Sequence, residues 1–76
     1  MLPYTLEIDA IGLKCPMPLL KLKKGLNELH SADVVKILVT DPAAHLDFGV
    51  FCQQAAHEIL TIAQHDNVKT FYIKKA

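Results

Sequence analysis

Four stretches of the chain have the apolar–polar pattern of β-strands. In the first, Tyr4, Leu6 and Ile8 alternate with polar side chains, as in a strand with one buried face. The last shows a similar alternation and follows the turn signal Asp66-Asn67. The stretch 34–40 is β-branched and nearly continuously apolar, which is typical of a central strand. The pattern therefore predicts strands over residues 4–9, 34–40, 59–63 and 68–74.

Two further stretches repeat apolar residues at helical spacing. Between about residues 16 and 29 the spacing predicts an amphipathic helix with a buried stripe of Leu19, Leu22, Leu26 and Leu29, widened by Leu20. A second helix is predicted from residue 43 or 44 to about 56, with a buried stripe of Phe48, Phe51, Cys52 and Ala55. Gly25 lies inside the first helix and costs about 1 kcal/mol relative to alanine. A glycine at this position could allow the helix to lie close to a sheet.

The resulting order, βαβαββ, predicts an α+β fold in a single domain spanning residues 1–76. We expect an α/β two-layer sandwich, with two helices packed on one face of a four-stranded mixed sheet. Right-handed crossovers make the strands that they join parallel. The loops at 10–14 and 41–42 then lie at the same edge of the sheet, where ligands of α/β sheets usually bind.

Composition and charge narrow the class of protein. Eight basic residues, all lysine, balance eight acidic ones. Because nucleic-acid binding by a lone domain normally needs a net basic field and favours arginine, no direct nucleic-acid contact is expected. The 51% hydrophobic content argues against intrinsic disorder, and two cysteines cannot form a disulfide scaffold. The first residues do not resemble a signal peptide, and no stretch approaches the roughly 20 apolar residues of a membrane span. We therefore expect a cytoplasmic protein without membrane association.

The segment Gly12-Leu-Lys-Cys-Pro-Met-Pro18 carries the candidate chemistry. Pro16 disfavours the α conformation for Cys15 and suits the first helical position, so Cys15 is expected at the N-cap of the helix. The positive end of the helix dipole, the neighbouring Lys14 and the lysines of the following helix favour a thiolate, which predicts a Cys15 pKa below the ordinary value. Cys15 is the candidate nucleophile, although a lone cysteine is more often a small buried hydrophobe.

Other polar and sulfur-containing side chains have two interpretations each. Cys52 lies on an apolar helix face and is expected to pack in the core, with a resolving partner for Cys15 as the alternative. Asp41 is a turn former or helix cap before Pro42, or a functional group at the same edge as Cys15. Asp47 is expected to be a solvated charge on the second helix.

Metal and partner sites have weaker signals. The four histidines form no close metal-binding spacing with a cysteine, so neither a metal nor another cofactor is expected: His30, His45, His57 and His65. The lysines on the polar face of the first helix are usually only solvated. Beside a reactive cysteine they could also dock an acidic partner, with Lys21 and Lys24 as the candidates.

The stretch Asp9-Ala-Ile-Gly-Leu-Lys-Cys-Pro-Met-Pro18 resembles the TusA/SirA family of small sulfur carriers. The similarity covers nearly the whole chain and continues through Asp41-Pro42-Ala43, Asp47, Phe51-Cys52, His57-Glu58-Ile59-Leu60 and the closing strand Phe71-Tyr72-Ile73-Lys74. It implies a two-layer βαβαββ fold in which Cys15 accepts sulfur as a persulfide. The motif residues that support Cys15 are then Gly12, Leu13, Lys14, Pro16, Pro18 and Asp41.

The resemblance also implies the partners, which are a cysteine desulfurase or another sulfur donor protein and a downstream sulfur acceptor protein. Its members serve transfer RNA thiolation or other sulfur-trafficking pathways. Met17 stands where members of the transfer RNA pathway commonly carry glutamate, so sulfur carriage follows more firmly than that pathway. A sulfurtransferase-like carrier acting with partner enzymes is the first hypothesis. The alternatives are a protein-binding regulatory module without chemistry and a disulfide redox protein using Cys15 and Cys52.

Overall fold

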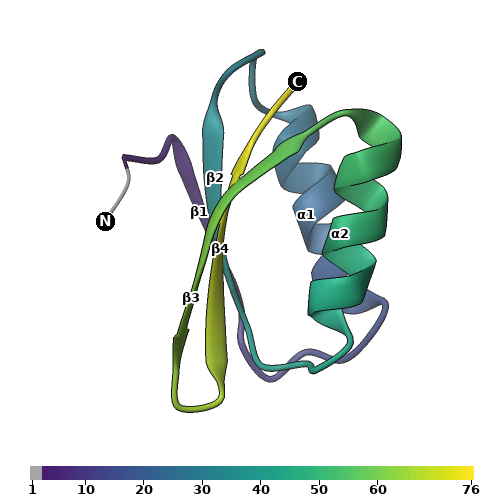
Figure 1. The fold of residues 1–76 in the computed structure, drawn as a ribbon, viewed down its shortest axis with the longest axis vertical. Helices are drawn as coiled ribbons and strands as arrows, with labels where there is room; N and C mark the ends of the chain where they lie inside the picture. Colours follow the sequence, from purple (N-terminus) through teal and green to yellow (C-terminus); the bar gives the residue numbers. More distant parts are fainter. Residues whose placement is uncertain (1–2) are drawn as a thin grey trace.

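The computed structural model describes residues 3–76 and has the predicted order of elements (Figure 1). Met1 and Leu2, which begin the segment compared with signal peptides, lie outside the described residues. The elements are β1 (Leu6–Ala10), α1 (Met17–Asn27), β2 (Val34–Val39), α2 (Ala44–Ala55), β3 (Glu58–His65) and β4 (Val68–Lys74).

The strands form one mixed sheet in the order β1-β2-β4-β3. β1 and β2 are parallel, whereas β4 is antiparallel to both of its neighbours, β2 and β3. Figure 1 shows both helices on the same side of this sheet, which confirms the predicted two-layer sandwich. The carboxyl ends of β1 and β2 therefore lie at the same edge, and the loops that lead into α1 and α2 both start there.

The core fills the space between the helices and the covered face of the sheet. Val35 pairs with Ile73 and Ile37 with Phe71, and all four side chains are fully buried. The Phe71 ring meets the Phe48 ring of α2 edge-on, with 4.9 Å between the ring centroids. The remaining large buried side chains are Val39 of β2, Pro18, Leu22 and Leu26 of α1, and Phe48 of α2.

Gly25 lies where α1 crosses β1. A Cβ atom added to this glycine would lie 2.5 Å from Cδ1 of Ile8 and 3.2 Å from Cδ2 of Leu6. Both distances are shorter than an ordinary van der Waals contact, so α1 rests on β1 through the glycine backbone. The close approach that the sequence allowed is therefore present.

Three apolar side chains that were assigned to the core lie elsewhere. Leu20 is 49% exposed, and Ala55 at the end of α2 is also exposed, because the buried stripe of each helix is narrower than predicted. Tyr4 precedes β1, which begins at Leu6, so the strand alternation does not extend to it. Its hydroxyl donates a hydrogen bond of 3.0 Å to Glu7, and its ring lies 6.4 Å from that of Tyr72.

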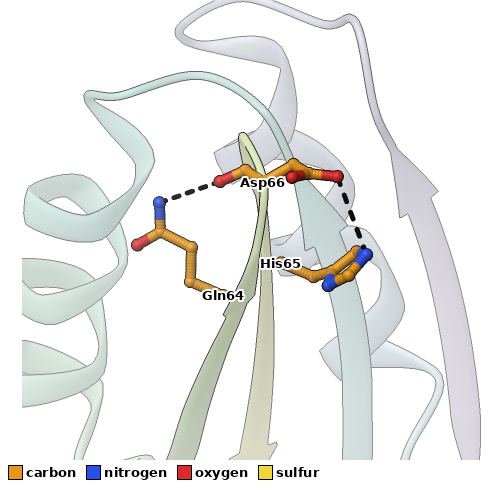
Figure 2. Close-up of polar contacts among 3 residues, drawn as sticks. All are labelled: Gln64, His65 and Asp66. Atoms are coloured by element: carbon orange, nitrogen blue, oxygen red, sulfur yellow. Dashed lines mark hydrogen bonds and ion pairs between the residues drawn. The ribbon is translucent and has the colours of Figure 1, made fainter.

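β3 is longer than the predicted 59–63, because pairing with β4 continues from Glu58 to His65 across a bulge near Leu60. The hairpin turns at Asp66, whose φ of 55° lies in the left-handed region. Figure 2 shows the Gln64 amide donating to the Asp66 carbonyl oxygen, and His65 within 3.6 Å of the Asp66 carboxylate. Both side chains of this ion pair are almost fully exposed, so the pair adds little stability.

Candidate functional site

The loops that follow β1 and β2 meet below the helices (Figure 1). Together they enclose a concavity of about 430 Å³ that is lined by Gly12, Leu13, Lys14, Cys15, Thr40, Asp41 and Pro42. A second concavity, of about 290 Å³, shares Thr40, Asp41 and Pro42 and extends toward the β3–β4 hairpin at Gln64, Asn67 and Lys69. Most of the motif residues thus surround Cys15 at the predicted edge.

The first loop is held by hydrogen bonds from its own backbone. Gly12 has a φ of +82°, a conformation that side chains rarely adopt, and its amide donates to the Thr40 hydroxyl at 2.9 Å. The amide of Ile11 donates to the Asp9 carboxylate at 3.0 Å. The Gly12 bond fastens the loop to the residue after β2, and the Ile11 bond fastens it to β1, so the cysteine that follows starts from a fixed backbone.

Cys15 lies one residue farther from the helix than predicted. α1 begins at Met17, and Pro16 occupies the N-cap position. The Met17 amide donates to the Lys14 carbonyl at 2.8 Å, so the first helical amide bonds the loop rather than Cys15. Pro18 is the second helical residue and is buried, where its missing N–H costs nothing.

Asp41 joins the two loops and is the predicted turn former, whereas Ala43 occupies the cap position of α2. Its Oδ2 accepts a hydrogen bond of 2.7 Å from the Cys15 amide, and its Oδ1 accepts one of 3.0 Å from the amide of Ala43. The second bond is the turn-forming contact before α2. The first fixes the backbone of Cys15, so the same carboxylate also belongs to the edge.

The Cys15 thiol is exposed and donates a hydrogen bond of 3.2 Å to Oδ2 of Asp47, on the first turns of α2. This bond raises the pKa of Cys15 above its ordinary value, and partial desolvation and the charges of Asp47 and Asp41 act in the same direction. The predicted lowering of the Cys15 pKa is therefore wrong. The nearest charges that influence the sulfur are carboxylates, and Lys14 does not offset them.

Asp47 was predicted to be a solvated charge, and this is also wrong. Its side chain is half-buried and faces Cys15. The helical pattern alone placed Asp47 opposite the apolar stripe of α2, which is correct for the helix in isolation. The available signal was its position six residues after Asp41, in the first turns of a helix that starts at the same edge as Cys15.

Cys52 occupies the core, as the helical pattern predicts. Its side chain is only 3% exposed, and burial raises its pKa to about 11. Both cysteines are free thiols in the structure. A buried thiol with so high a pKa is a poor partner for disulfide exchange, which weighs against the redox alternative.

The lysine side chains of α1 lie in two different places. Lys21 and Lys24 are exposed and line a groove over β1 with Leu6, Ile8, Gly25 and Glu28, so they do not belong to the concavity of Cys15. Lys23 extends toward α2, where its ammonium lies 5.3 Å from the centre of the Phe51 ring. A docking role for Lys21 and Lys24 stays a prediction.

No group of three or more His, Cys, Asp or Glu side chains that could hold a metal ion occurs within residues 3–76. His45 instead stacks edge-on against Phe71, and His57 accepts a hydrogen bond of 3.0 Å from the Ala76 amide. Burial lowers the pKa of His57, and the charge of Lys75 adds to this effect. In the same part of the chain, neither helix is long and apolar enough to cross a membrane.

Comparison with known proteins identifies a family and several relatives that resemble this chain. Residues 6–75 match the family described as Sulfurtransferase TusA. The chain is 37% identical over 76 residues to the sulfur carrier protein TusA of Allochromatium vinosum, covering 100% of both chains. It is 35% identical over 72 residues to TusA of Pseudomonas entomophila, covering 95% of this chain and 90% of the relative. Its fold matches the crystal structure of the SirA-like protein of Desulfitobacterium hafniense with a TM-score of 0.82 and 26% identity, covering 92% and 96% of the two chains.

Proposed function

The chain belongs to the TusA family of sulfurtransferases, and we propose that it carries sulfur as a persulfide on Cys15. The observation that carries this proposal is the placement of Cys15. Its exposed thiol lies in the concavity formed by the two loops, on a backbone fixed by Asp41. Cys52 is buried in the core. Cys15 is therefore the thiol that a partner protein can reach.

Loading of the carrier is a thiol exchange without net oxidation. The Cys15 thiolate attacks the outer sulfur of a donor persulfide, R–S–SH. The donor S–S bond breaks, a new S–S bond forms to Cys15, and the donor sulfur leaves as a thiolate that takes up the proton released by Cys15. In sum, Cys15–SH and R–S–SH give Cys15–S–SH and R–SH. Exchange of this kind depends on the thiolate fraction and on access to the sulfur.

Unloading uses the same chemistry in the opposite sense. A thiolate of the acceptor protein attacks the outer sulfur of the Cys15 persulfide, and Cys15 leaves as a thiolate that is then protonated. The fixed loop supports both steps because the hydrogen bonds of the Gly12 and Cys15 amides hold the cysteine in one position on the surface. An ordered thiol also reduces the conformational entropy lost when a partner docks.

The partners follow from the chemistry of the exchange. We propose that a cysteine desulfurase or another sulfur donor protein loads Cys15 and that a downstream sulfur acceptor protein unloads it in the cytoplasm, where thiols stay reduced. Thiolation of transfer RNA is one destination. The proposal gives the chain no direct nucleic-acid contact, because its net charge is zero and it has no arginine.

Loading of single-cysteine variants tests this proposal. The reduced Cys15→Ser and Cys52→Ser variants are incubated with a cysteine desulfurase and cysteine, and their intact masses are compared. We expect Cys52→Ser to gain sulfur as the wild type does and Cys15→Ser to gain none. Equal loading of the two variants contradicts the assignment. A folded Cys15→Ser variant that still binds the partner fully and performs the same cellular role supports the regulatory module instead.

A further inference from the structure

Two contacts, from the backbone and the side chain, tie Cys15 to the start of α2. The Cys15 amide donates to Asp41 at 2.7 Å, and the Cys15 thiol donates to Asp47 at 3.2 Å. Two carboxylates therefore lie beside Cys15, one bonded to its amide and the other to its thiol. This is the opposite of the cationic surroundings that usually activate a cysteine.

The negative charge beside the sulfur is not neutralised. Among residues 3–76 the only ion pair joins His65 and Asp66, in the β3–β4 hairpin. Lys14 precedes Cys15 in the chain but pairs with neither carboxylate at this site. On α1, the ammonium of Lys23 lies over the Phe51 ring of α2.

We propose that Asp47 is a positioning residue that holds Cys15 as a neutral, directed thiol in the free carrier. A thiol donates a hydrogen bond to a carboxylate, whereas a thiolate has no proton to donate and is repelled by it. The contact therefore stabilises the protonated form of Cys15, in agreement with its raised pKa. The inference rests on the proposed sulfur carriage and adds a regulation of the same site.

A restrained thiol suits a carrier that must not react at random. Because the thiolate is the attacking species, the free protein reacts slowly with stray disulfides and oxidants at neutral pH. The same carboxylate repels an anionic sulfur on Cys15. Asp47 therefore slows reactions of the free carrier without blocking access to the thiol, which stays exposed.

The test is the pH profile of Cys15 alkylation by iodoacetamide, a neutral probe, with peptide mapping to separate Cys15 from Cys52. Asp47→Asn keeps the shape and a hydrogen-bond acceptor but removes the charge. Asp66→Asn is the matched control, because it removes one carboxylate charge at an exposed turn (Figure 2), and asparagine tolerates the left-handed φ there. Asp47→Glu restores the charge.

We expect Asp47→Asn to shift the alkylation midpoint to lower pH and to raise the rate at pH 7 by roughly threefold to tenfold, as for removal of one charge about 4 Å away in surroundings as polar as bulk water. Asp66→Asn should follow the wild type, and Asp47→Glu should move the profile back toward it. An unchanged profile in folded Asp47→Asn overturns the proposal, since a merely structural aspartate would change the melting temperature and leave the profile alone.

A measurement on the wild type alone tests the proposal if the Asp47 variants do not fold. The alkylation midpoint of Cys15 in the native protein should lie above that of the same chain unfolded in urea, and an equal or lower midpoint overturns the proposal. Sulfur loading by a cysteine desulfurase is measured separately on the wild type. A protein that shows the Asp47 shift but accepts no sulfur contradicts the carrier function and leaves the protonation role of Asp47 standing.

Discussion

The backbone amide of Cys15 donates a 2.7 Å hydrogen bond to the carboxylate of Asp41, which lies 26 residues later in the chain. This contact joins the loop before α1 to the loop before α2, so the cysteine is positioned by a residue of the loop that follows the neighbouring strand. The site thus depends on the parallel pairing of β1 with β2, which brings the two loops to one edge of the sheet.

Replacing Asp41 tests this connection. Asp41→Ala removes the acceptor of two backbone amides, those of Cys15 and Ala43. We expect it to lower the free energy of unfolding by about 1–2 kcal/mol, as for the loss of two modest hydrogen bonds near the surface. It should also slow sulfur loading, because the Cys15 loop is released. Asp41→Asn keeps one acceptor oxygen and should lose about half as much stability. Urea unfolding checks the order, and an Asp41→Ala variant as stable and as active as the wild type contradicts it.

The two helical glycines should respond to alanine in opposite directions. A Cβ at Gly25 meets Ile8 and Leu6, so Gly25→Ala combines a helix gain of about 1 kcal/mol with an overpacking cost of about 1–3 kcal/mol. We expect a net destabilisation of about 1 kcal/mol. A Cβ at Gly49 meets no atom within 4 Å, so Gly49→Ala should stabilise α2 by about 0.5–1 kcal/mol. Thermal unfolding of the two variants provides the comparison, and equal shifts of the same sign would refute the proposed close approach of α1 to β1.

Burial of Cys52 predicts a loss of stability in alkaline solution. Its pKa is about 11 in the folded protein against an ordinary value of 9.0, so the folded state holds this proton more tightly than the unfolded state. The stabilising contribution is therefore complete below pH 9 and is lost as the pH rises from 9 to about 11. It amounts to at most about 3 kcal/mol.

Cys52→Ala isolates this effect from the titration of the lysines. The difference in unfolding free energy between the wild type and the variant should be largest near neutral pH and should shrink between pH 9 and about 11. The loss of the sulfur atom's packing lowers the unfolding free energy of the variant by the same amount at every pH. A difference that does not change across this range would show that Cys52 does not titrate in the way its burial implies.

The fold was predictable where local pattern and tertiary structure agree. The bounds of β4 were predicted correctly, because alternation over residues 68–74 coincides with pairing on both of its edges. The end of β3 was missed because Gln64 and His65 are exposed polar residues that are ordered by pairing with β4. Tyr4 was assigned to the core face because the alternation of apolar and polar residues begins two residues before the strand itself, which starts at Leu6.

The candidate site was predictable in its location but not in its electrostatics. Chain order and crossover handedness were enough to bring Cys15 and Asp41 to one edge. The thiolate prediction considered only groups close to Cys15 in the sequence, namely Lys14, the start of the helix and the lysines of that helix. The decisive neighbour is Asp47, on another helix, and its orientation depends on how α1 and α2 pack. Such a contact leaves no periodic signal in either segment.

Transfer of sulfur to Cys15 is tested most directly by intact and peptide masses of the wild-type protein after loading. The reduced protein is incubated with a cysteine desulfurase and cysteine, and its intact mass and peptide masses are then recorded. We predict one added sulfur atom on the peptide that contains Cys15, removed by a reductant. Added sulfur confined to the Cys52 peptide, or none on a folded protein with a free Cys15 thiol after trials with several desulfurases, would contradict the assignment.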